Sequence, residues 1–369
     1  MFTHKLTDDA ELRLIEPRNA EELFLQIDRN RERLSQWMTF VDKAGSVDAE
    51  RVFAKRGLHQ FADGEGFHCD IMLKGKIVGG IGMMPVNVWN RSTELGYWLD
   101  ADAEGKGLVT ASCRALLDHC FNEMNINRVT LRTASGNTRS QAVAKRLGAV
   151  HESTQRQSAI LQNKLVDIEV FSILKNEWPA GSPTGRAFFT YRLDDKTELG
   201  LLEPIHSKAV FDLVDRNREH LRRWFSWVDE TQSEDDALAT RKKQLHNFAK
   251  NGSMAAGIWH FGSLAGLIGF HTHNAKCMEI GYWLSEEHQG KGLAISSCKQ
   301  LIRYAFEDLH INRIEIRAEP GNSRSWAIPR RLGFTYEGTL RQASVSSDGS
   351  MADMMVFSLL KDEWDTRLD

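Results

Sequence analysis

The chain has 369 residues, which is more than one ordinary domain requires and enough for two domains that each bury their own core. Its formal net charge is −3 with 26% charged residues of mixed sign, so the composition favours neither a nucleic acid nor an anionic membrane as partner. The apolar runs are interrupted, no signal-peptide pattern is present, and the five cysteines follow neither disulfide nor zinc spacing, so we expect a soluble cytoplasmic protein with reduced thiols.

The first half of the chain predicts elements in a mixed α/β order. Leu23, Ile27 and Leu34 recur at near-helical spacing within one amphipathic segment. In chain order we expect a strand over 12–15, helices over 20–37 and 48–61, strands over 67–73, 77–84 and 94–99, a helix from the glycine-rich segment 105–107 to about 124, a strand over 129–133, a helix over 138–147 and a final pair of strands. This order predicts a mixed, mostly antiparallel sheet with flanking helices.

The second half of the chain repeats the first. Residues 94–99 (ELGYWL) recur as 279–284 (EIGYWL), an offset of 185 residues (279 − 94), and residues 28–32 match 215–219 at an offset of 187 (215 − 28). Further matches at the offset of 185 join 105–108 with 290–293, 126–128 with 311–313, and 146–148 with 331–333. Gene duplication explains this pattern. We predict two domains, 1–178 and 187–369, joined by a linker over 179–186.

A glycine-rich turn lies between a strand and a helix in each half, at 105–107 and 290–292. Such a turn presents unpaired backbone N–H groups and the positive end of a helix dipole, which together suit a phosphate group. Lys106 and Lys291 add a cation to each turn. The alternative is that the glycines only make a tight turn.

The residues around the second turn resemble the acetyl-CoA signature of the GNAT family of N-acetyltransferases. In that signature a Gln or Arg is followed after two residues by Gly, and after one more by Gly or Ala; Gln289, Gly292 and Ala294 match. The motifs over 279–284, 322–325 and 331–338 are similar to those of the RimL and RimJ ribosomal-protein N-acetyltransferases. The resemblance covers both halves and implies two central strands that splay apart to admit the pantetheine arm of CoA, with the pyrophosphate on the glycine turn. It assigns acetyl-CoA binding to Trp283, Leu284, Gln289, Gly290, Lys291, Gly292, Leu293, Ala294 and Asn322.

The first half departs from this signature at two positions. Glu104 replaces the Gln or Arg, and Val109 replaces the small last residue. A carboxylate repels a pyrophosphate, and a β-branched side chain crowds the backbone approach, so we expect weaker cofactor binding there. The weaker equivalents retained in this half are Gly105, Lys106, Gly107, Asn137 and Ser140.

Acetyl transfer to an amine requires a base, stabilisation of an oxyanion and a proton for the departing thiolate. The resemblance implies Glu279 as a base acting through water, the alternative being a structural carboxylate at the end of a strand. Backbone N–H groups near Trp283 and Leu284 would stabilise the oxyanion. Ser325 would protonate the sulfur, although Ser, like the cofactor-contacting Asn three residues before it, is also a preferred helix cap.

Two tyrosines of the central strands are further candidates for an acid. Tyr97 and Tyr282 share a strand face with Leu and Ile residues, so we expect both to pack in the core instead.

Acceptor specificity is predicted to come from two segments of the second half. Trp224 and Trp227 follow its first helix, and His271 and His273 precede its central strand. Such an aromatic cluster is also typical of a core or an interdomain contact. Neither histidine has a carboxylate partner at metal-ligand spacing, so we expect no metal.

The leading hypothesis is an N-acetyltransferase that moves an acetyl group from acetyl-CoA to a primary amine by direct attack in a ternary complex. The acceptor would be a protein N-terminus, as in the ribosomal-protein enzymes, or a small amine. A second hypothesis makes the first domain a non-catalytic binding module, and a third makes the chain an acyl-CoA-responsive partner protein without catalysis. Because relatives of this type commonly pair, the two domains are expected to form a pseudo-dimer within a monomeric chain.

Overall fold

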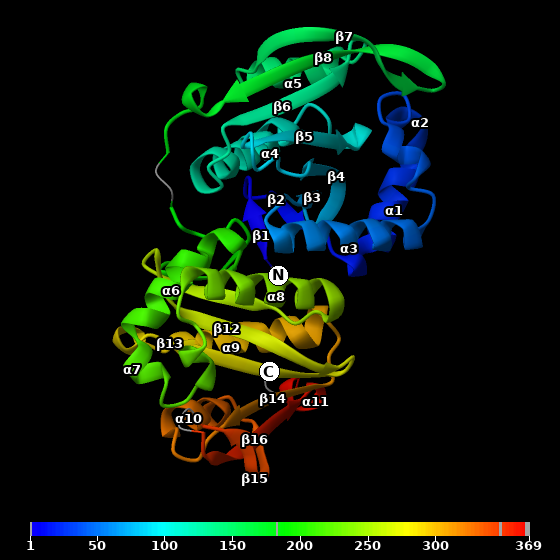
Figure 1. Ribbon diagram of the computed structural model, residues 1–369. Coiled ribbons are helices and arrows are strands. Elements are labelled where there is room, and N and C mark those ends of the chain that lie inside the picture. The colour runs from blue at the N-terminus through cyan, green and yellow to red at the C-terminus, as the bar shows by residue number, and fades with distance from the viewer. Residues whose placement is uncertain (1, 182–183, 347–348, 366–369) are drawn as a thin grey trace. The chain divides into compact units, whose positions relative to one another are not determined.

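The computed structural model describes residues 2–181, 184–346 and 349–365. The chain divides into two compact units, Phe2–Phe189 and Thr190–Asp369, and each contains its own set of strands and helices (Figure 1). The segment expected as a linker, 179–186, falls within the first unit, and its residues 182 and 183 lie outside the described part of the chain.

The strands of the first unit are ordered β1-β2-β3-β4-β5-β6-β8-β7. Their bounds are β1 Thr3–Lys5, β2 Ala10–Leu14, β3 His68–Leu73, β4 Lys76–Met83, β5 Ser92–Leu99, β6 Arg128–Ala134, β7 Val150–Leu161 and β8 Lys164–Leu174. Neighbours run antiparallel except β5 and β6, which are parallel. The alternation expected of a strand is clear in β2, where Ala10, Leu12 and Leu14 are buried and the residues between them are partly exposed.

The second unit repeats this topology as β9-β10-β11-β12-β13-β14-β16-β15. Its strands are β9 Thr190–Arg192, β10 Thr197–Leu201, β11 Ala255–His260, β12 Ser263–Asn274, β13 Cys277–Leu284, β14 Arg313–Ala318, β15 Thr335–Val345 and β16 Met351–Leu360. Among the described residues of this unit, only β13 and β14 pair in parallel. The predicted mixed, mostly antiparallel sheet is therefore confirmed in both halves.

The helices also correspond between the units. Those of the first are α1 Ala20–Arg29, α2 Arg31–Leu34, α3 Val47–Asp63, α4 Leu108–Asp118 and α5 Thr138–Arg146. Those of the second are α6 Ser207–Arg216, α7 Arg218–Leu221, α8 Glu234–Asn251, α9 Leu293–Arg303, α10 Ser323–Arg331 and α11 Lys361–Asp365. The Ser46 and Ser233 side chains cap α3 and α8, and Gly64 and Gly252 end these helices with φ of 75° and 80°. In Figure 1, α8 lies across the near face of the second unit's sheet.

The prediction of one helix over 20–37 is wrong, because the helix breaks at Asn30. This residue is 6% exposed, and its side-chain amide donates to the carbonyl of Gln26 at 3.0 Å and to the Asp100 carboxylate at 2.9 Å. An Asn side chain that bonds the backbone in this way competes with the helical hydrogen bonds. Asn217 breaks the corresponding helix and accepts a hydrogen bond from the Glu286 backbone N–H at 2.9 Å. The break therefore ties the second helical segment to the turn after the central strand.

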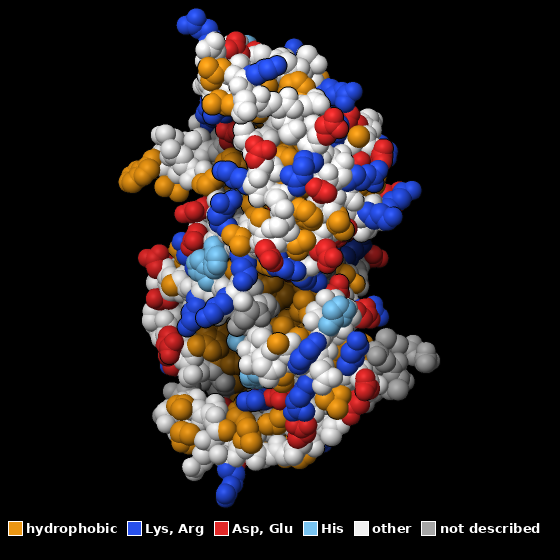
Figure 2. Space-filling model, turned by 90° about the vertical axis from the view of Figure 1, so that its right-hand side faces the viewer, with side chains coloured by type: hydrophobic (Ala, Val, Ile, Leu, Met, Phe, Trp, Pro, Cys, Tyr) orange, Lys and Arg blue, Asp and Glu red, His pale blue; other side chains and the backbone are white. Residues whose placement is uncertain are grey.

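The surface carries charges of both signs. On the face drawn in Figure 2, Lys and Arg side chains are interspersed with Asp and Glu side chains, so neither sign forms a continuous field there. Among the residues that the structure describes, no helix is both long enough and apolar enough to cross a bilayer.

Candidate active site

The two parallel strands of the second unit separate part of the way along their length. β13 and β14 pair through Cys277 with Arg313, Met278 with Ile314, and Glu279 with Glu315. β13 continues to Leu284 and remains paired with β12 throughout, whereas β14 stays with β16. Beyond Glu279 the facing edges are thus free to present backbone N–H and C=O groups to a third partner.

The first unit separates in the same way. Its three parallel pairs join residues 92–94 with 128–130, and β5 continues to Leu99. Both halves therefore have an opening between their central strands.

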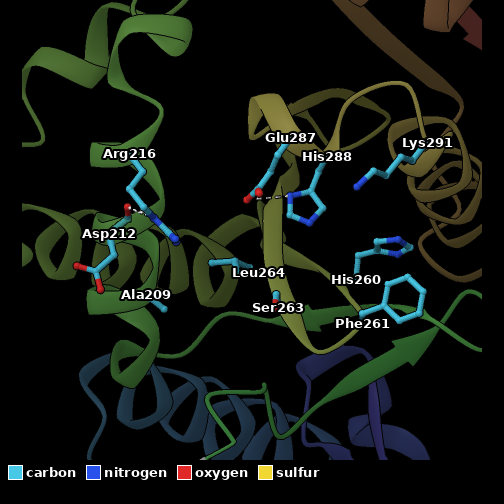
Figure 3. Close-up of a pocket in the computed structure, with 10 residues that line it drawn as sticks. All are labelled: Ala209, Asp212, Arg216, His260, Phe261, Ser263, Leu264, Glu287, His288 and Lys291. Atoms are coloured by element: carbon cyan, nitrogen blue, oxygen red, sulfur yellow. Dashed lines mark hydrogen bonds and ion pairs between the residues drawn. The ribbon is translucent and has the colours of Figure 1, made fainter.

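A cavity of about 960 Å³ lies at the open end of the β13–β14 pair. It brings together ten of the residues predicted from the sequence: Trp224, Trp283, Leu284, Gln289, Gly290, Gly292, Leu293, Ala294, Asn322 and Ser325. Its volume is in the range of pockets that hold a cofactor-sized molecule. The side chain of Lys291 does not line this cavity but a different pocket (Figure 3).

The glycine turn at the cavity depends on backbone conformations that favour glycine. Gly290 and Gly292 have φ of +73° and +78°, and Gly292 is the N-terminal cap of α9. The first unit has the same geometry at Gly105 and Gly107, with φ of +76° and +75°. The unpaired N–H groups of the first turn of α9 therefore start at the cavity, as an anion site requires.

Gln289 is held between two side chains from other elements. Its side-chain nitrogen lies 2.6 Å from Nε2 of His220, and its side-chain oxygen accepts a hydrogen bond from Arg324 at 2.5 Å. Burial, with help from the nearby Arg223 and Arg324, lowers the pKa of His220, so the neutral imidazole accepts the bond from the amide. The sequence analysis did not single out His220.

The corresponding cluster in the first unit has different charged side chains but the same net formal charge. Glu104 accepts hydrogen bonds from Arg33 at 2.7 Å and from Arg139 at 2.6 Å. Arg33 occupies the position of His220 (220 − 187), and Arg139 that of Arg324 (324 − 185). The acid is therefore accompanied by an added cation, and each cluster has a formal charge of +1.

The cavity in the second unit is lined by more basic than acidic side chains. Arg223, Arg324 and Arg331 line it together with one acid, Glu286. The sequence contained these arginines within its motifs, but nothing in their spacing indicated that they face one cavity. Guanidinium groups bind phosphate oxygens in a fork geometry, so the lining suits a polyphosphate ligand.

Asn322 and Ser325 form a helix cap beside the tyrosine of the central strand. The Asn322 side-chain oxygen accepts a hydrogen bond from the Ser325 backbone N–H at 3.1 Å. The Tyr282 hydroxyl donates to the Ser325 carbonyl at 3.0 Å and lies 3.5 Å from its Oγ. Burial raises the pKa of Tyr282, so its hydroxyl stays protonated.

The position of Tyr282 corrects the expectation that this residue packs in the core. Its side chain lines the cavity, where its hydroxyl bonds Ser325 of α10. Tyr97 makes the equivalent contact in the first unit, 2.9 Å from Oγ of Ser140.

Glu279 lies at the last paired position of β13, within a network of charged side chains. Its carboxylate is 3.2 Å from Nε2 of His273 and 3.5 Å from Nε of Arg317. Arg317 also bonds Glu315 at 2.8 Å, and Arg313 bonds the same carboxylate at 2.9 Å. Burial alone would raise the pKa of Glu315, but the bonds from Arg317 and Arg313 outweigh it and the pKa is lowered.

His271 lies near this network on the same side of β13. It pairs with Glu279 across the β12–β13 ladder, and a Cβ atom added to Gly281 would lie 3.7 Å from its ring. Within the described residues no group of three or more His, Cys, Asp or Glu side chains is arranged to hold a metal ion.

The corresponding acid in the first unit, Glu94, has a different environment. Burial raises the pKa of Glu94, and Arg132 opposes that shift.

The predicted aromatic residues separate into two groups. Trp224 lines the cavity and packs over Gly321, where an added Cβ would lie 3.7 Å from the indole. Trp227 lies outside the cavity lining, with its ring 6.1 Å from that of Trp283.

Comparison with known proteins gives a consistent assignment. The family described as acetyltransferase (GNAT) domain matches residues 10–150 and 200–335. A putative ribosomal N-acetyltransferase, YdaF of Bacillus subtilis, is 35% identical over 179 residues, covering 48% of this chain and 98% of the relative. The ribosomal-protein-serine acetyltransferase of Escherichia coli is 29% identical over 161 residues, covering 43% of this chain and 90% of the relative. The crystal structure of a probable acetyltransferase superposes with a TM-score of 0.46 at 35% identity, over 48% of this chain and 99% of that one.

The family model and the two sequence relatives, together with the site, define an acetyl-CoA-dependent N-acetyltransferase. The chain belongs to the GNAT acetyltransferase family, and it contains the family's domain twice in tandem.

Proposed function

We propose that the second domain transfers an acetyl group from acetyl-CoA to the primary amine of a polypeptide N-terminus or a small molecule, by direct attack in a ternary complex. The observation that carries this proposal is the opening between β13 and β14 above the glycine turn, with the 960 Å³ cavity at its end. The names of the relatives, a ribosomal N-acetyltransferase and a ribosomal-protein-serine acetyltransferase, favour a protein acceptor.

In this proposal, acetyl-CoA is held by the basic lining and the glycine turn. The N–H groups at Gly292 and the start of α9 would bind the pyrophosphate, with Arg324 and Arg331 supplying positive charge. Gln289 would be a positioning residue that connects Arg324 to His220. The opening between the strands would admit the pantetheine arm and bring the thioester to β13.

The amine would reach the thioester from the side of Glu279. Strand alternation puts Glu279, Gly281 and Trp283 on one face of β13, and Tyr282 on the other. Glu279 would take a proton from the ammonium group, directly or through a water, so that the neutral nitrogen attacks the carbonyl carbon. Backbone N–H groups near Trp283 and Leu284 would stabilise the oxyanion.

The departing thiolate would take its proton on the opposite side of the opening. When the C–N bond has formed and the C–S bond breaks, the sulfur carries the electron pair and needs one proton. Ser325 and Tyr282 are the hydroxyl groups that line the cavity beside each other. Ser325 would give its hydroxyl proton to the sulfur and regain one from water. Burial raises the pKa of Tyr282, so its hydroxyl stays protonated, donates to the Ser325 carbonyl and would position Ser325.

We further propose that the first domain binds CoA despite Glu104 and Val109, from which weaker binding is expected. Arg33 and Arg139 neutralise the Glu104 carboxylate, and Ala101 stands where the second domain has Glu286 (286 − 185). Two CoA sites of equal affinity would contradict the non-catalytic alternative for this domain, whereas a weaker second site would not. Calorimetry of the full chain with CoA tests the point, since two sites per chain are expected and a single site would contradict it.

The experiment for the main proposal follows release of the free thiol of CoA from acetyl-CoA. The acceptors are peptides that begin with serine or alanine, and the same peptides blocked at the N-terminus serve as the matched control. Thiol release with the free peptides alone supports the proposal. Release with none of the peptides and none of a panel of small amines would contradict it.

A further inference from the structure

A second pocket in the second unit shares no lining residue with the acetyl-CoA cavity. It has a volume of about 720 Å³ and lies between the end of α6, the turn joining β11 to β12, and the segment before α9 (Figure 3). Arg216 comes from α6, His260 and Phe261 from the β11–β12 turn, and His288 and Lys291 from the last segment. The reaction proposed above uses none of these side chains; Lys291 takes part in it only as a residue of the glycine turn.

Both histidines are fixed by hydroxyl groups on their Nδ1 side. His260 Nδ1 lies 3.0 Å from the Thr197 hydroxyl, and His288 Nδ1 lies 2.7 Å from the Ser285 hydroxyl. A hydroxyl that donates to Nδ1 leaves the proton of the neutral ring on Nε2, where it is a donor. The two rings are 6.1 Å apart and perpendicular, so both can contribute to one small site.

Two permanent cations complete the donor set. Figure 3 shows Lys291 extending toward His288 and Arg216 reaching in from α6, whereas the Asp212 carboxylate points away from the histidines. Asp212 is also neutralised by Lys208, whose ammonium group lies 2.8 Å away. Glu287 is the remaining acid of the lining, 3.6 Å from His288, and its side chain is 71% exposed to water.

Phe261 places an exposed aromatic ring at the pocket. The residue is 68% exposed, and its φ of +50° belongs to the turn between β11 and β12, as the φ of +49° at Lys74 belongs to the corresponding turn of the first copy. The Phe261 ring stands at the pocket beside His260, with ring centroids 4.6 Å apart, and Lys196 lies 5.3 Å from its centre.

The first copy of the domain lacks three of these side chains. Leu73, Lys74 and Ala103 occupy the positions of His260, Phe261 and His288 (offsets of 187, 187 and 185). It keeps both cations, Arg29 at the position of Arg216 (216 − 187) and the lysine of the glycine turn, but Lys106 donates to the carbonyl of Asp102 at 2.9 Å. The two histidines and the aromatic ring therefore distinguish the second copy.

We propose that this pocket binds a small phosphate-bearing anion at a site separate from the acetyl-CoA cavity. A phosphate group has several acceptor oxygens, and the guanidinium of Arg216, the ammonium of Lys291 and the two imidazole Nε2 atoms approach it from different elements. The volume admits either free phosphate or a nucleoside monophosphate. If the ligand is a nucleotide, its base would lie against Phe261.

The test measures binding of inorganic phosphate and of AMP to the full chain by calorimetry, with and without saturating CoA. The variant His260→Leu with His288→Ala carries the first copy's residues at both histidines without adding a charge, and Arg216→Ala removes one cation. Either change should weaken phosphate binding about tenfold or more, because each removes donors that bond a charged group. Lys299→Ala, an exposed lysine of α9 outside the pocket, is the control with the same charge change and should leave binding unaltered.

Several outcomes would overturn the proposal. These are the absence of phosphate binding by the native chain, equal binding by all variants, and displacement of phosphate by CoA, which would merge this pocket with the cofactor site. Unchanged CoA binding and thermal unfolding of the variants would show that they are folded. Tighter binding of AMP than of phosphate, lost on Phe261→Ala alone, would assign the ligand as a nucleotide; equal affinities would assign it as free phosphate.

Discussion

Replacing Gln289 by Glu in the second domain should weaken CoA binding, and adding His220→Arg should restore it. In the native chain the Gln289 amide donates to the neutral His220 ring at 2.6 Å and accepts from Arg324 at 2.5 Å. A carboxylate keeps the second bond but loses the first, and it adds a negative charge beside the proposed pyrophosphate site. The lost bond and the unpaired acceptor cost about 1–3 kcal/mol, which corresponds to roughly 5- to 150-fold weaker binding.

The rescue follows from the first domain, where nature has made both changes. Arg33 donates to Glu104 at 2.7 Å, so an arginine at position 220 should form the same pair. Calorimetry with CoA on the full chain measures the effect as a change in the dissociation constant of the second domain's site. The reciprocal variant, Arg33→His with Glu104→Gln, should leave the affinity of the first domain's site for CoA close to its native value. A double variant that binds CoA no better than Gln289→Glu alone would refute the compensation argument.

Three further predictions concern the reaction and the charged network. Ser325→Ala should lower kcat by roughly 10²- to 10⁴-fold, the range for a general acid, while the same change at Ser140 should leave the second domain's turnover unaffected; equal effects of the two would contradict the assignment. Glu279→Gln should lower the rate most at low pH and less at high pH, where the amine loses its proton unaided; a pH-independent loss in the rate profile would point to a structural role. Hydrogen bonds from Arg313 lower the pKa of Glu337 from 4.5 to about 2. The stability that this pair adds is therefore complete above the pKa of the unfolded chain and is lost as the pH falls from about 4.5 to 2. Urea unfolding of native and Glu337→Gln proteins should therefore differ at neutral pH and converge in acid, and a constant difference would count against the ion pair.

The sequence predicted what depends on local patterns. The repeat, the order of helices and strands along the chain and the glycine turns at 105–107 and 290–292 follow from local sequence patterns, and the structure has these strands and turns. The break at Asn30 was not predictable, because its cause is a hydrogen bond to Asp100 across 70 residues of sequence.

The side-chain arrangement of the site was predictable only in part. His220, Gln289 and Arg324 come from three separate elements, and nothing in their spacing indicates that they touch. The direction of Lys291 was also hidden, since its two flanking glycines line one cavity and its side chain another. The direction of a side chain depends on tertiary packing, which the sequence motifs do not reveal, whereas the motifs do reveal which residue types belong to the site.

Initial rates of thiol release, measured with acetyl-CoA and a peptide amine both varied, test the central claim most directly. Direct attack in a ternary complex at the opening between β13 and β14 predicts double-reciprocal lines that intersect. Parallel lines, which indicate an acetylated enzyme and a ping-pong reaction, would contradict the account.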